Sequence, residues 1–234
     1  MEADRDRMVK LLWTGGWDST FRLIQLAVKG AKVQPYYIIL EDRRSTLKEI
    51  GQMSRIKKDL ELKYNDCVIN DTIFVVGSDV KISSEITSAY DKLIKDRFLG
   101  GQYPVLSALS DRVSGLELSI HRDDKAEYFV RKLDRESSYL NSDVFTIFGG
   151  FNYPIINYTK IKMEEEAKES GDIETLYKSW FCHTPINDTP CGYCNPCRYS
   201  IDEGMKKRFD FRGRLYNKAP ILFKLFRVFL SKVI

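Results

Sequence analysis

Long hydrophobic runs are absent from this sequence of 234 residues. No apolar stretch approaches the ~18 residues that would suggest a membrane-spanning helix. The segment from Met1 to Arg7 alternates charges where a secretory signal would need an apolar stretch. We therefore expect a protein without a membrane span, located in the cytoplasm.

Cysteine is scarce and unevenly placed. The sequence has five cysteines, and four of them fall within sixteen residues near its C-terminal end. An odd total, with four of the five cysteines gathered in one place, argues against the scattered disulfide framework of small secreted proteins. The cluster instead predicts a metal-binding segment.

An excess of one charge is confined to the C-terminal segment. The formal net charge is +4, but residues 205–234 hold nine Lys or Arg and one Asp, a local +8, which leaves −4 for residues 1–204. The main body therefore gives no strong nucleic-acid signal, because binding phosphates calls for a basic face. We expect a main domain at 1–204, which includes the cysteine segment 182–197, and a basic tail at 205–234.

The tail carries a helical pattern of its own. Residues 220–234 place Lys, Arg and Ser at helical spacing among Ile, Leu, Phe and Val, which predicts an amphipathic helix. Its apolar face needs a cover. The chain's own core or a homodimer is one candidate for that cover, and a protein partner or a membrane surface is another.

Apolar periodicity predicts strands that alternate with helices. This rhythm is typical of an α/β fold, here a five-stranded, mostly parallel sheet with helices on both faces. The expected strands are Met8–Trp13, Val33–Leu40, Thr72–Val76, Leu116–His121 and Val144–Phe148. The expected helices cover 21–30, 46–62, 84–98, 103–113, 124–139 (a helix or an insertion), 160–168 and 198–209.

A glycine turn joins the first expected strand to the first helix, and it reads Thr14-Gly15-Gly16-Trp17-Asp18-Ser19-Thr20. Glycines let backbone amides approach an anion, and a helix N-terminus presents unpaired N–H groups. Ser19 and Thr20 can donate hydrogen bonds to phosphate, whereas Asp18 suits Mg²⁺ that bridges phosphates. The turn therefore predicts a nucleotide with its metal. The alternative is a tight turn in which Asp18 or Ser19 only caps the helix.

This turn resembles the PP-loop of the N-type ATP pyrophosphatases, S-G-G-x-D-S, with Thr14 in place of the first serine. It is neither a Walker A loop nor a dinucleotide fingerprint. The resemblance implies an adenine nucleotide alpha hydrolase-like fold and cleavage of ATP between its α and β phosphates. AMP would pass to a carboxylate or carbonyl oxygen. The implied contacts to ATP and Mg²⁺ come from Thr14, Gly15, Gly16, Trp17, Asp18, Ser19, Thr20 and Leu40.

The clustered cysteines follow the pattern C-x8-C-x2-C-x2-C and are Cys182, Cys191, Cys194 and Cys197. Four thiolates suit tetrahedral Zn²⁺, and a closed shell of four cysteines is structural, since no position remains for substrate or water. An iron–sulfur cluster and unligated or oxidised thiols are the alternatives. We leave His183 out of the ligand set and expect Cys67 to be a free, partly buried thiol.

The two motifs together resemble the 7-cyano-7-deazaguanine synthase (QueC) family. Pro154 to Lys162 matches the family segment P-L-I-x-L-T-K-x-E-I, and Pro190 to Arg198 follows P-C-G-x-C-x-x-C-R. The likeness covers about residues 8–209. It implies that Lys160 faces the α-phosphate, where a fixed ammonium stabilises the transition state, and that Asp18, Ser19 and Lys160 are the catalytic residues. The alternative for Lys160 is a solvated lysine in a helical turn.

The family adenylates the carboxylate of 7-carboxy-7-deazaguanine, lets ammonia displace AMP, and dehydrates the amide to a nitrile with a second ATP. The resemblance thus implies a ligase that releases AMP and takes this small molecule as substrate. The sequence contains no glutaminase-like segment, so that free ammonia is one candidate nucleophile. Relatives in antiviral gene clusters attach the base to a protein, which makes a protein amine the other.

The expected base pocket departs from the family. Where the family has P-x-R-N-like and G-V-N segments, this sequence has Gly100 to Pro104 and Ser119 to His121. We expect substrate contacts from Gln102, His121 and Arg43, because a guanidinium can pair bidentately with a carboxylate. Structural roles are the alternative for His121 and Arg43. The competing functions are a PP-loop ligase or thiolase acting on another carboxylate or a tRNA base, and a nucleotide-binding module without turnover.

Overall fold

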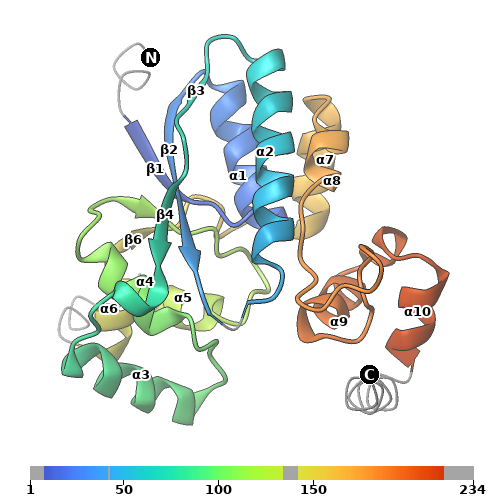
Figure 1. Cartoon of the computed structure of the whole chain (residues 1–234). Coiled ribbons are helices and arrows are strands. Elements are labelled where there is room, and N and C mark those ends of the chain that lie inside the picture. The colour runs from blue at the N-terminus through green and yellow to red at the C-terminus, as the bar shows by residue number, and fades with distance from the viewer. Residues whose placement is uncertain (1–7, 42, 134–141, 219–234) are drawn as a thin grey trace.

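The computed structural model describes residues 8–41, 43–133 and 142–218, which form an α/β fold around a parallel sheet (Figure 1). The strand order is β3-β2-β1-β5-β6, and β4 pairs with β2 beyond the end of β3. Six short strands therefore fill five positions, as the sequence predicts. Their bounds are β1 Met8–Leu12, β2 Lys32–Ile39, β3 Val68–Ile69, β4 Ile73–Val76, β5 Leu116–Glu117 and β6 Phe151–Asn152.

The strand order reverses direction at β1, which lies between β2 and β5. Leu12 of β1 pairs with Tyr36 of β2, and Leu11 pairs with Glu117 of β5. The loops that leave neighbouring strands at such a reversal diverge and form a crevice at the carboxyl ends of the strands. The glycine turn after β1 and the segment after β5 both start there.

Helices cover both faces of the sheet (Figure 1). Successive residues of a strand point to opposite faces, and Leu11 and Leu12 accordingly belong to separate cores. One core packs against α1, α2, α7 and α8, and the other against α3 to α6. The bounds are α1 Trp17–Val28, α2 Thr46–Lys63, α3 Ser84–Asp96, α4 Tyr103–Ser110, α5 Glu127–Leu133, α6 Asp143–Phe148, α7 Lys160–Glu169 and α8 Ile173–Tyr177.

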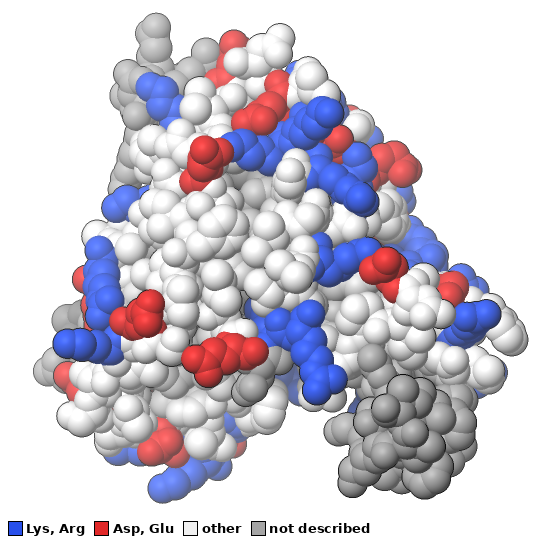
Figure 2. All heavy atoms as spheres, in the orientation of Figure 1, with Lys and Arg blue, Asp and Glu red and all other residues white. Residues whose placement is uncertain are grey.

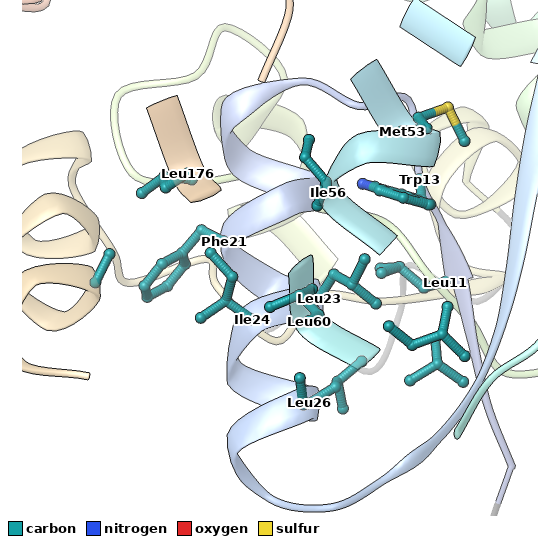
Figure 3. Close-up of a cluster of buried hydrophobic side chains, with 14 of the residues drawn as sticks. Leu11, Trp13, Phe21, Leu23, Ile24, Leu26, Met53, Ile56, Leu60 and Leu176 are labelled. Carbon is teal, nitrogen blue, oxygen red and sulfur yellow. The ribbon is translucent and has the colours of Figure 1, made fainter. Parts of the chain in front are cut away.

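The first core is built around α1 (Figure 3). Leu23 and Ile24 of this helix are buried, and the indole of Trp13 lies near Met53 and Ile56 of α2. Fully burying an apolar side chain of this size contributes about 1.5–3 kcal/mol. This packing fixes α1 firmly behind the glycine turn.

One edge of the sheet is apolar and uncovered by any described segment. Val68, Ile73, Phe74 and Val76 are exposed there, on β3 and β4. Figure 2 shows few Lys, Arg, Asp or Glu side chains over this part of the molecule. β4 pairs with β2 on one side, and no strand within the described residues pairs with its other side.

Residues 179–218, here called the cysteine lobe, form a third, small core beside the α/β body (Figure 1). Trp180, Ile201 and Phe209 pack with the buried cysteines. Gly192 has φ +78°, and a Cβ on it would lie 1.8 Å from the carbonyl oxygen of Gly213, so only glycine fits there. The helices of the lobe are α9 Asn195–Asp202, the 3₁₀ turn η3 Lys206–Arg208 and α10 Phe211–Lys218.

The prediction of a fifth strand at Val144–Phe148 is wrong, because this segment is helix α6. Ser142 caps the helix by accepting a hydrogen bond from the Phe145 N–H at 3.1 Å. Val144, Ile147 and Phe148 are buried at helical spacing. In so short an apolar run, periodicity alone does not distinguish a helix from a strand. The last strand is instead β6, three residues further on.

Other boundaries also differ from the predictions. β5 ends at Glu117 rather than His121, and the helix expected at 198–209 is split into α9 and η3. Helix α5 covers part of the segment 124–139, whose remainder lies outside the described residues, as does the amphipathic helix expected at 220–234. None of the helices in the described ranges is long and apolar enough to cross a membrane.

Candidate nucleotide site and metal centre

The glycine turn leaves the N-terminus of α1 without a side-chain cap. Gly15 has φ +66°, and a Cβ on it would lie 2.8 Å from Met53 Cγ. Gly16 occupies the capping position of α1 and has no side chain to offer the first-turn amides. These amides normally have no partner within the helix, and together with the helix dipole they favour an anion.

The hydroxyl groups of Thr14 and Ser19 lie close together in the turn. The Oγ1 of Thr14 and the Oγ of Ser19 are 3.4 Å apart, and the Thr14 N–H donates to Ser19 Oγ at 3.3 Å. Thr20 differs from both: it is fully buried, and its hydroxyl accepts a hydrogen bond from the Trp13 indole at 3.2 Å. Thr14 and Ser19 are thus placed at the open side of the turn, whereas Thr20 belongs to the core.

A cavity opens beside the turn, at the carboxyl ends of β1 and β2 and the segment after β5. It is lined by Leu12, Thr14, Gly16, Asp18, Ser19, Ile38, Leu40, Arg43, Gln102, Tyr103, Leu106, Leu118, Ser119, Ile120 and Asp124. Seven residues predicted from the sequence share this wall, namely Thr14, Gly16, Asp18, Ser19, Leu40, Arg43 and Gln102. The predicted residues that are not part of the lining are Gly15, Trp17, Thr20, His121 and Lys160.

Asp18 lies in the first turn of α1, next to two basic side chains. Its Oδ1 is buried and accepts no hydrogen bond, although His121 Nδ1 is 3.6 Å away and Lys160 Nζ is 3.8 Å away. A buried carboxylate oxygen without a partner is costly and marks a place where a cation would fit. Oxygen donors of this kind suit Mg²⁺, so the residues present fit the metal that the sequence suggests.

Lys160 is held close to the cavity but behind Asp18. It is the first residue of α7, and its Nζ lies 2.8 Å from Glu203 Oε2 in the cysteine lobe. Burial lowers the pKa of Lys160, but the combined attraction of Asp18 and Glu203 outweighs burial and leaves that pKa above its ordinary value. Lys160 is therefore a firmly charged cation beside the turn.

His121 is buried behind the cavity wall, between two carboxylates. Its Nδ1 is 3.6 Å from Asp18 Oδ1 and 3.8 Å from Asp124 Oδ2, and it makes no hydrogen bond. Asp124, unlike His121, lines the cavity, and burial followed by the nearby Asp18 raises its pKa despite a hydrogen bond from the Ala126 N–H. His121 therefore does not line the cavity itself, but its neighbours Asp18 and Asp124 do.

Arg43 is fixed at the cavity rim by Glu49. The Arg43 Nε lies 2.9 Å from Glu49 Oε1, and the fully buried Glu49 also accepts hydrogen bonds from Tyr37 at 2.7 Å and Ser45 at 2.6 Å. This network stiffens the segment that follows β2. Arg43 thereby keeps a defined position at the rim, whereas Arg44 is exposed.

Sequence reasoning missed three charged residues of this region: Asp124, Glu203 and Arg208. Asp124 stands in a charged stretch that gives no local signal, and Glu203 and Arg208 reach the site only because the cysteine lobe folds back onto α1. The Arg208 guanidinium lies 5.1 Å from the Trp17 ring and 4.5 Å from the Phe181 ring. Burial lowers its pKa to about 10, which leaves it charged at neutral pH.

The four clustered cysteines converge in the lobe. Their sulfurs all lie within 4.8 Å of one another, with 3.8 Å between Cys191 and Cys197 and 4.0 Å between Cys194 and Cys182. Sulfurs bound at about 2.3 Å around a tetrahedral zinc would be about 3.8 Å apart, so the residues present fit such an ion. Backbone N–H groups of Cys191 and Cys194 donate to two of the sulfurs at 3.2 and 3.3 Å, which favours thiolates. The cluster can hold one metal ion.

The other two residues considered with the cysteines lie outside this cluster. His183 is exposed and is not among the grouped ligands. Cys67 is a free thiol in the core between β2 and α2, and burial raises its pKa to about 11. A buried thiol with a raised pKa is unreactive.

The lobe and the glycine turn are in direct contact. The Trp180 N–H donates to the Gly15 carbonyl at 2.7 Å, and the Trp180 indole donates to the Cys182 carbonyl at 2.8 Å. Arg208 donates to the Ser179 carbonyl and, at 3.0 Å, to the Ser179 hydroxyl. Cys182 of the cysteine cluster is therefore only two positions along the chain from Trp180, whose N–H contacts the turn.

No family model and no curated protein matches the sequence. Among solved structures, the fold is similar to a predicted subunit of a tRNA methyltransferase from Methanocaldococcus jannaschii. The two chains are 16% identical, the match covers 88% of this chain and 92% of that one, and the TM-score is 0.41. A similarity of this size assigns neither a family nor an activity to this chain.

Proposed function

We propose that this protein binds ATP with Mg²⁺ and transfers AMP to an oxygen of an acceptor, with release of pyrophosphate. One observation carries the proposal: the uncapped start of α1, the unpartnered Asp18 oxygen and the Thr14 and Ser19 hydroxyls lie together on one cavity wall. Gln102 and Tyr103 line the same cavity, and the acceptor would bind near them.

The chain's residues divide the work as follows. The first-turn amides of α1 and the two hydroxyls bind the departing phosphates, and Asp18 and Asp124 hold the metal. Mg²⁺, when bound, neutralises phosphate charge. An acceptor oxygen attacks the α-phosphorus, the bond from that phosphorus to the bridging oxygen breaks, and its electron pair leaves with pyrophosphate. Lys160 stabilises the negative charge that develops on the α-phosphate.

The finer proposal concerns the acceptor, which we take to be the carboxylate of 7-carboxy-7-deazaguanine. The sequence resemblance favours this substrate, and Arg43, which lines the cavity and whose Nε pairs with Glu49, would offer its remaining N–H groups to that carboxylate. A nitrogen nucleophile then attacks the acyl carbon, the bond to the phosphate oxygen breaks, and AMP leaves. Ammonia would yield an amide on the way to the nitrile, and a protein amine would yield a conjugate.

The second candidate acceptor is another carboxylate or a tRNA base, with the same transfer of AMP. Within this alternative, thiolation is disfavoured, since none of the residues that line the cavity is a cysteine and four of the five cysteines are gathered in the lobe. The exposed Lys and Arg of the lobe do not distinguish among the acceptors. Adenylation is common to all of them.

The test is exchange of labelled pyrophosphate into ATP, with 7-carboxy-7-deazaguanine, bulk tRNA or a set of small carboxylates as acceptor. We expect exchange with one acceptor, and AMP and pyrophosphate in equal amounts when ammonia is added. Asp18→Asn should abolish the exchange. Absence of exchange with every acceptor, from protein that binds ATP, would make the protein a binding module and refute the enzymatic proposal.

A further inference from the structure

The ion pair between Lys160 and Glu203 joins the nucleotide site to the cysteine lobe. Lys160 begins α7, whereas Glu203 directly follows α9, the helix that carries Cys197. The distance from Lys160 Nζ to Glu203 Oε2 is 2.8 Å, and the side chains are only 14% and 26% exposed. A pair sheltered from water is stronger than one at the surface, and this one fixes the end of a long, flexible side chain.

Glu203 also determines which acid Lys160 contacts. The ammonium is 2.8 Å from Glu203 Oε2 and 3.8 Å from Asp18 Oδ1, so that Glu203 is the nearer of its two acidic partners. Without Glu203, Asp18 would be the remaining acid within 4 Å of Lys160 among the described residues, and attraction would draw the ammonium onto it. The carboxylate needed for a cation would then be neutralised by the lysine needed for a phosphate.

Arg208 is a second, partly buried cation that the lobe brings to this region. Its repulsion acts to lower the pKa of Lys160. Its guanidinium is bound to Ser179 and lies against Trp17 and Phe181, so it cannot easily move away. Lys160 is therefore held by Glu203 at 2.8 Å, while its ammonium stays 3.8 Å from the Asp18 carboxylate.

We propose that Glu203 is a positioning residue, by which the cysteine lobe holds Lys160 away from Asp18 and keeps both ready for a nucleotide with its divalent cation. The proposal rests on the proposed function for the identity of these ligands. It makes the metal-binding lobe a working part of the nucleotide site, since folding of the lobe delivers the acid that sets the arrangement of Lys160 and Asp18.

The chain offers a matched control in Asp188. Its Oδ1 lies 3.0 Å from Lys48 Nζ, so that this pair also links the lobe to the α/β body. Asp188 is exposed and does not line the cavity. Asp188→Asn therefore removes one lobe contact without touching Lys160 or Asp18.

The experiment compares Glu203→Gln, Glu203→Asp and Asp188→Asn in full-length, metal-loaded protein. The first readout is titration of Lys160 by NMR on ¹³C-methylated lysines, with Lys160→Arg to assign the signal. Glu203→Gln should lower the pKa of Lys160, because it removes the nearer of the two carboxylates within 4 Å of the ammonium, and Glu203→Asp should restore part of the shift. Asp188→Asn should leave the titration unchanged.

The second readout is binding of Mn²⁺, the probe for the Asp18 carboxylate, measured by electron paramagnetic resonance without nucleotide. Glu203→Gln should weaken Mn²⁺ binding about tenfold, which corresponds to roughly 1.4 kcal/mol, because Lys160 then pairs with Asp18. With an active acceptor, the same variant should lower kcat about 10- to 100-fold, since small misplacements of a catalytic group cost this much. Asp188→Asn should match the native protein in both assays.

Two results would overturn the proposal: a Glu203→Gln protein with native Lys160 titration and native Mn²⁺ affinity, or an Asp188→Asn protein with the same changes as Glu203→Gln. Thermal unfolding checks that each variant is folded, and Glu203→Asp carries the comparison if Glu203→Gln is not. Failure of the proposed function would appear differently, as native protein that never forms AMP. The titration and Mn²⁺ readouts need no turnover and would still decide the role of Glu203.

Discussion

The glycine turn and the cluster of four cysteines differ in how their polar atoms are satisfied. At the turn, Asp18 Oδ1 and His121 Nδ1 are buried without hydrogen bonds, and the helix end has no side-chain cap. In the cysteine cluster, the four sulfurs lie within 4.8 Å of one another, and those of Cys182 and Cys191 accept hydrogen bonds from backbone N–H groups. Unpaired polar atoms reduce stability and leave room for a ligand that comes and goes, whereas a closed shell contributes to folding. The comparison separates a region whose buried polar atoms lack hydrogen bonds from one in which four sulfurs gather closely enough to share one metal ion.

The largest effect is expected when one cysteine is removed from the cluster of four. Cys191→Ala should abolish metal binding and unfold the lobe, because the binding free energy of a structural zinc, roughly 10 kcal/mol or more, is folding free energy. Hydrogen exchange should show loss of protection at α9 and retained protection at β1 and β2. Cys67→Ala is the control and should keep one metal per chain. A Cys191→Ala protein with native protection of the lobe would remove the basis for the contrast.

The next largest effect is expected when the Asp18 carboxylate is removed from the glycine turn. Asp18→Asn should reduce acceptor-dependent pyrophosphate exchange by at least about 100-fold, as expected for loss of a metal ligand at the reacting phosphates. Metal content of the lobe should not change, and the unfolding midpoint should shift by only a few degrees. The exposed Asp111, which does not line the cavity, provides the control Asp111→Asn. Loss of zinc in Asp18→Asn would show that the two regions are not separate.

A smaller effect is expected where the two regions touch. Gly15→Ala places a side chain at φ +66° and 2.8 Å from Met53 Cγ, and it disturbs the carbonyl that accepts the Trp180 N–H. We expect a loss of about 1–3 kcal/mol in the free energy of unfolding, measured with urea. Gly51→Ala is the matched control, since Gly51 lies in α2 with no atom within 4 Å of an added Cβ. That variant should gain about 0.5–1 kcal/mol.

The smallest effect is expected at Glu164, whose ion pair with Lys207 is a more exposed contact between the lobe and α7 than the pair of Glu203 with Lys160. Burial raises the pKa of Glu164, but Lys168 and Lys207 lower it by more, so that it lies below the ordinary 4.5. Their pairing therefore stabilises the protein above about pH 4.5, and this contribution is lost as the pH falls through the folded pKa. Glu164→Gln should cost less than about 1 kcal/mol at pH 7, and this cost should shrink as the pH falls through the folded pKa. An effect at pH 7 as large as that of Gly15→Ala would contradict this ranking.

Local patterns predicted much of the fold and part of the site. The turn from Thr14 to Ser19 and the cysteines are contiguous or closely spaced in the sequence, and the structure brings each set together. Glu203 and Arg208 were missed because their positions depend on how the lobe docks, which no local pattern encodes. His121 was expected to contact substrate, but the short β5 and the turn after it bury its ring behind Asp124. The apolar run 144–148 suits either a strand or a helix, and the Ser142 cap decides for the helix.

The central position of β1 has a consequence for synthesis of the chain. This strand is made before its neighbour β5, which follows roughly a hundred residues later, so that Leu11 cannot pair with Glu117 until then. Until then, one side of the nascent strand has backbone groups without partners and apolar side chains open to other chains. Slow translation between β4 and β5 would prolong that exposure. A chaperone that binds the segment around β1 during this time would reduce its aggregation.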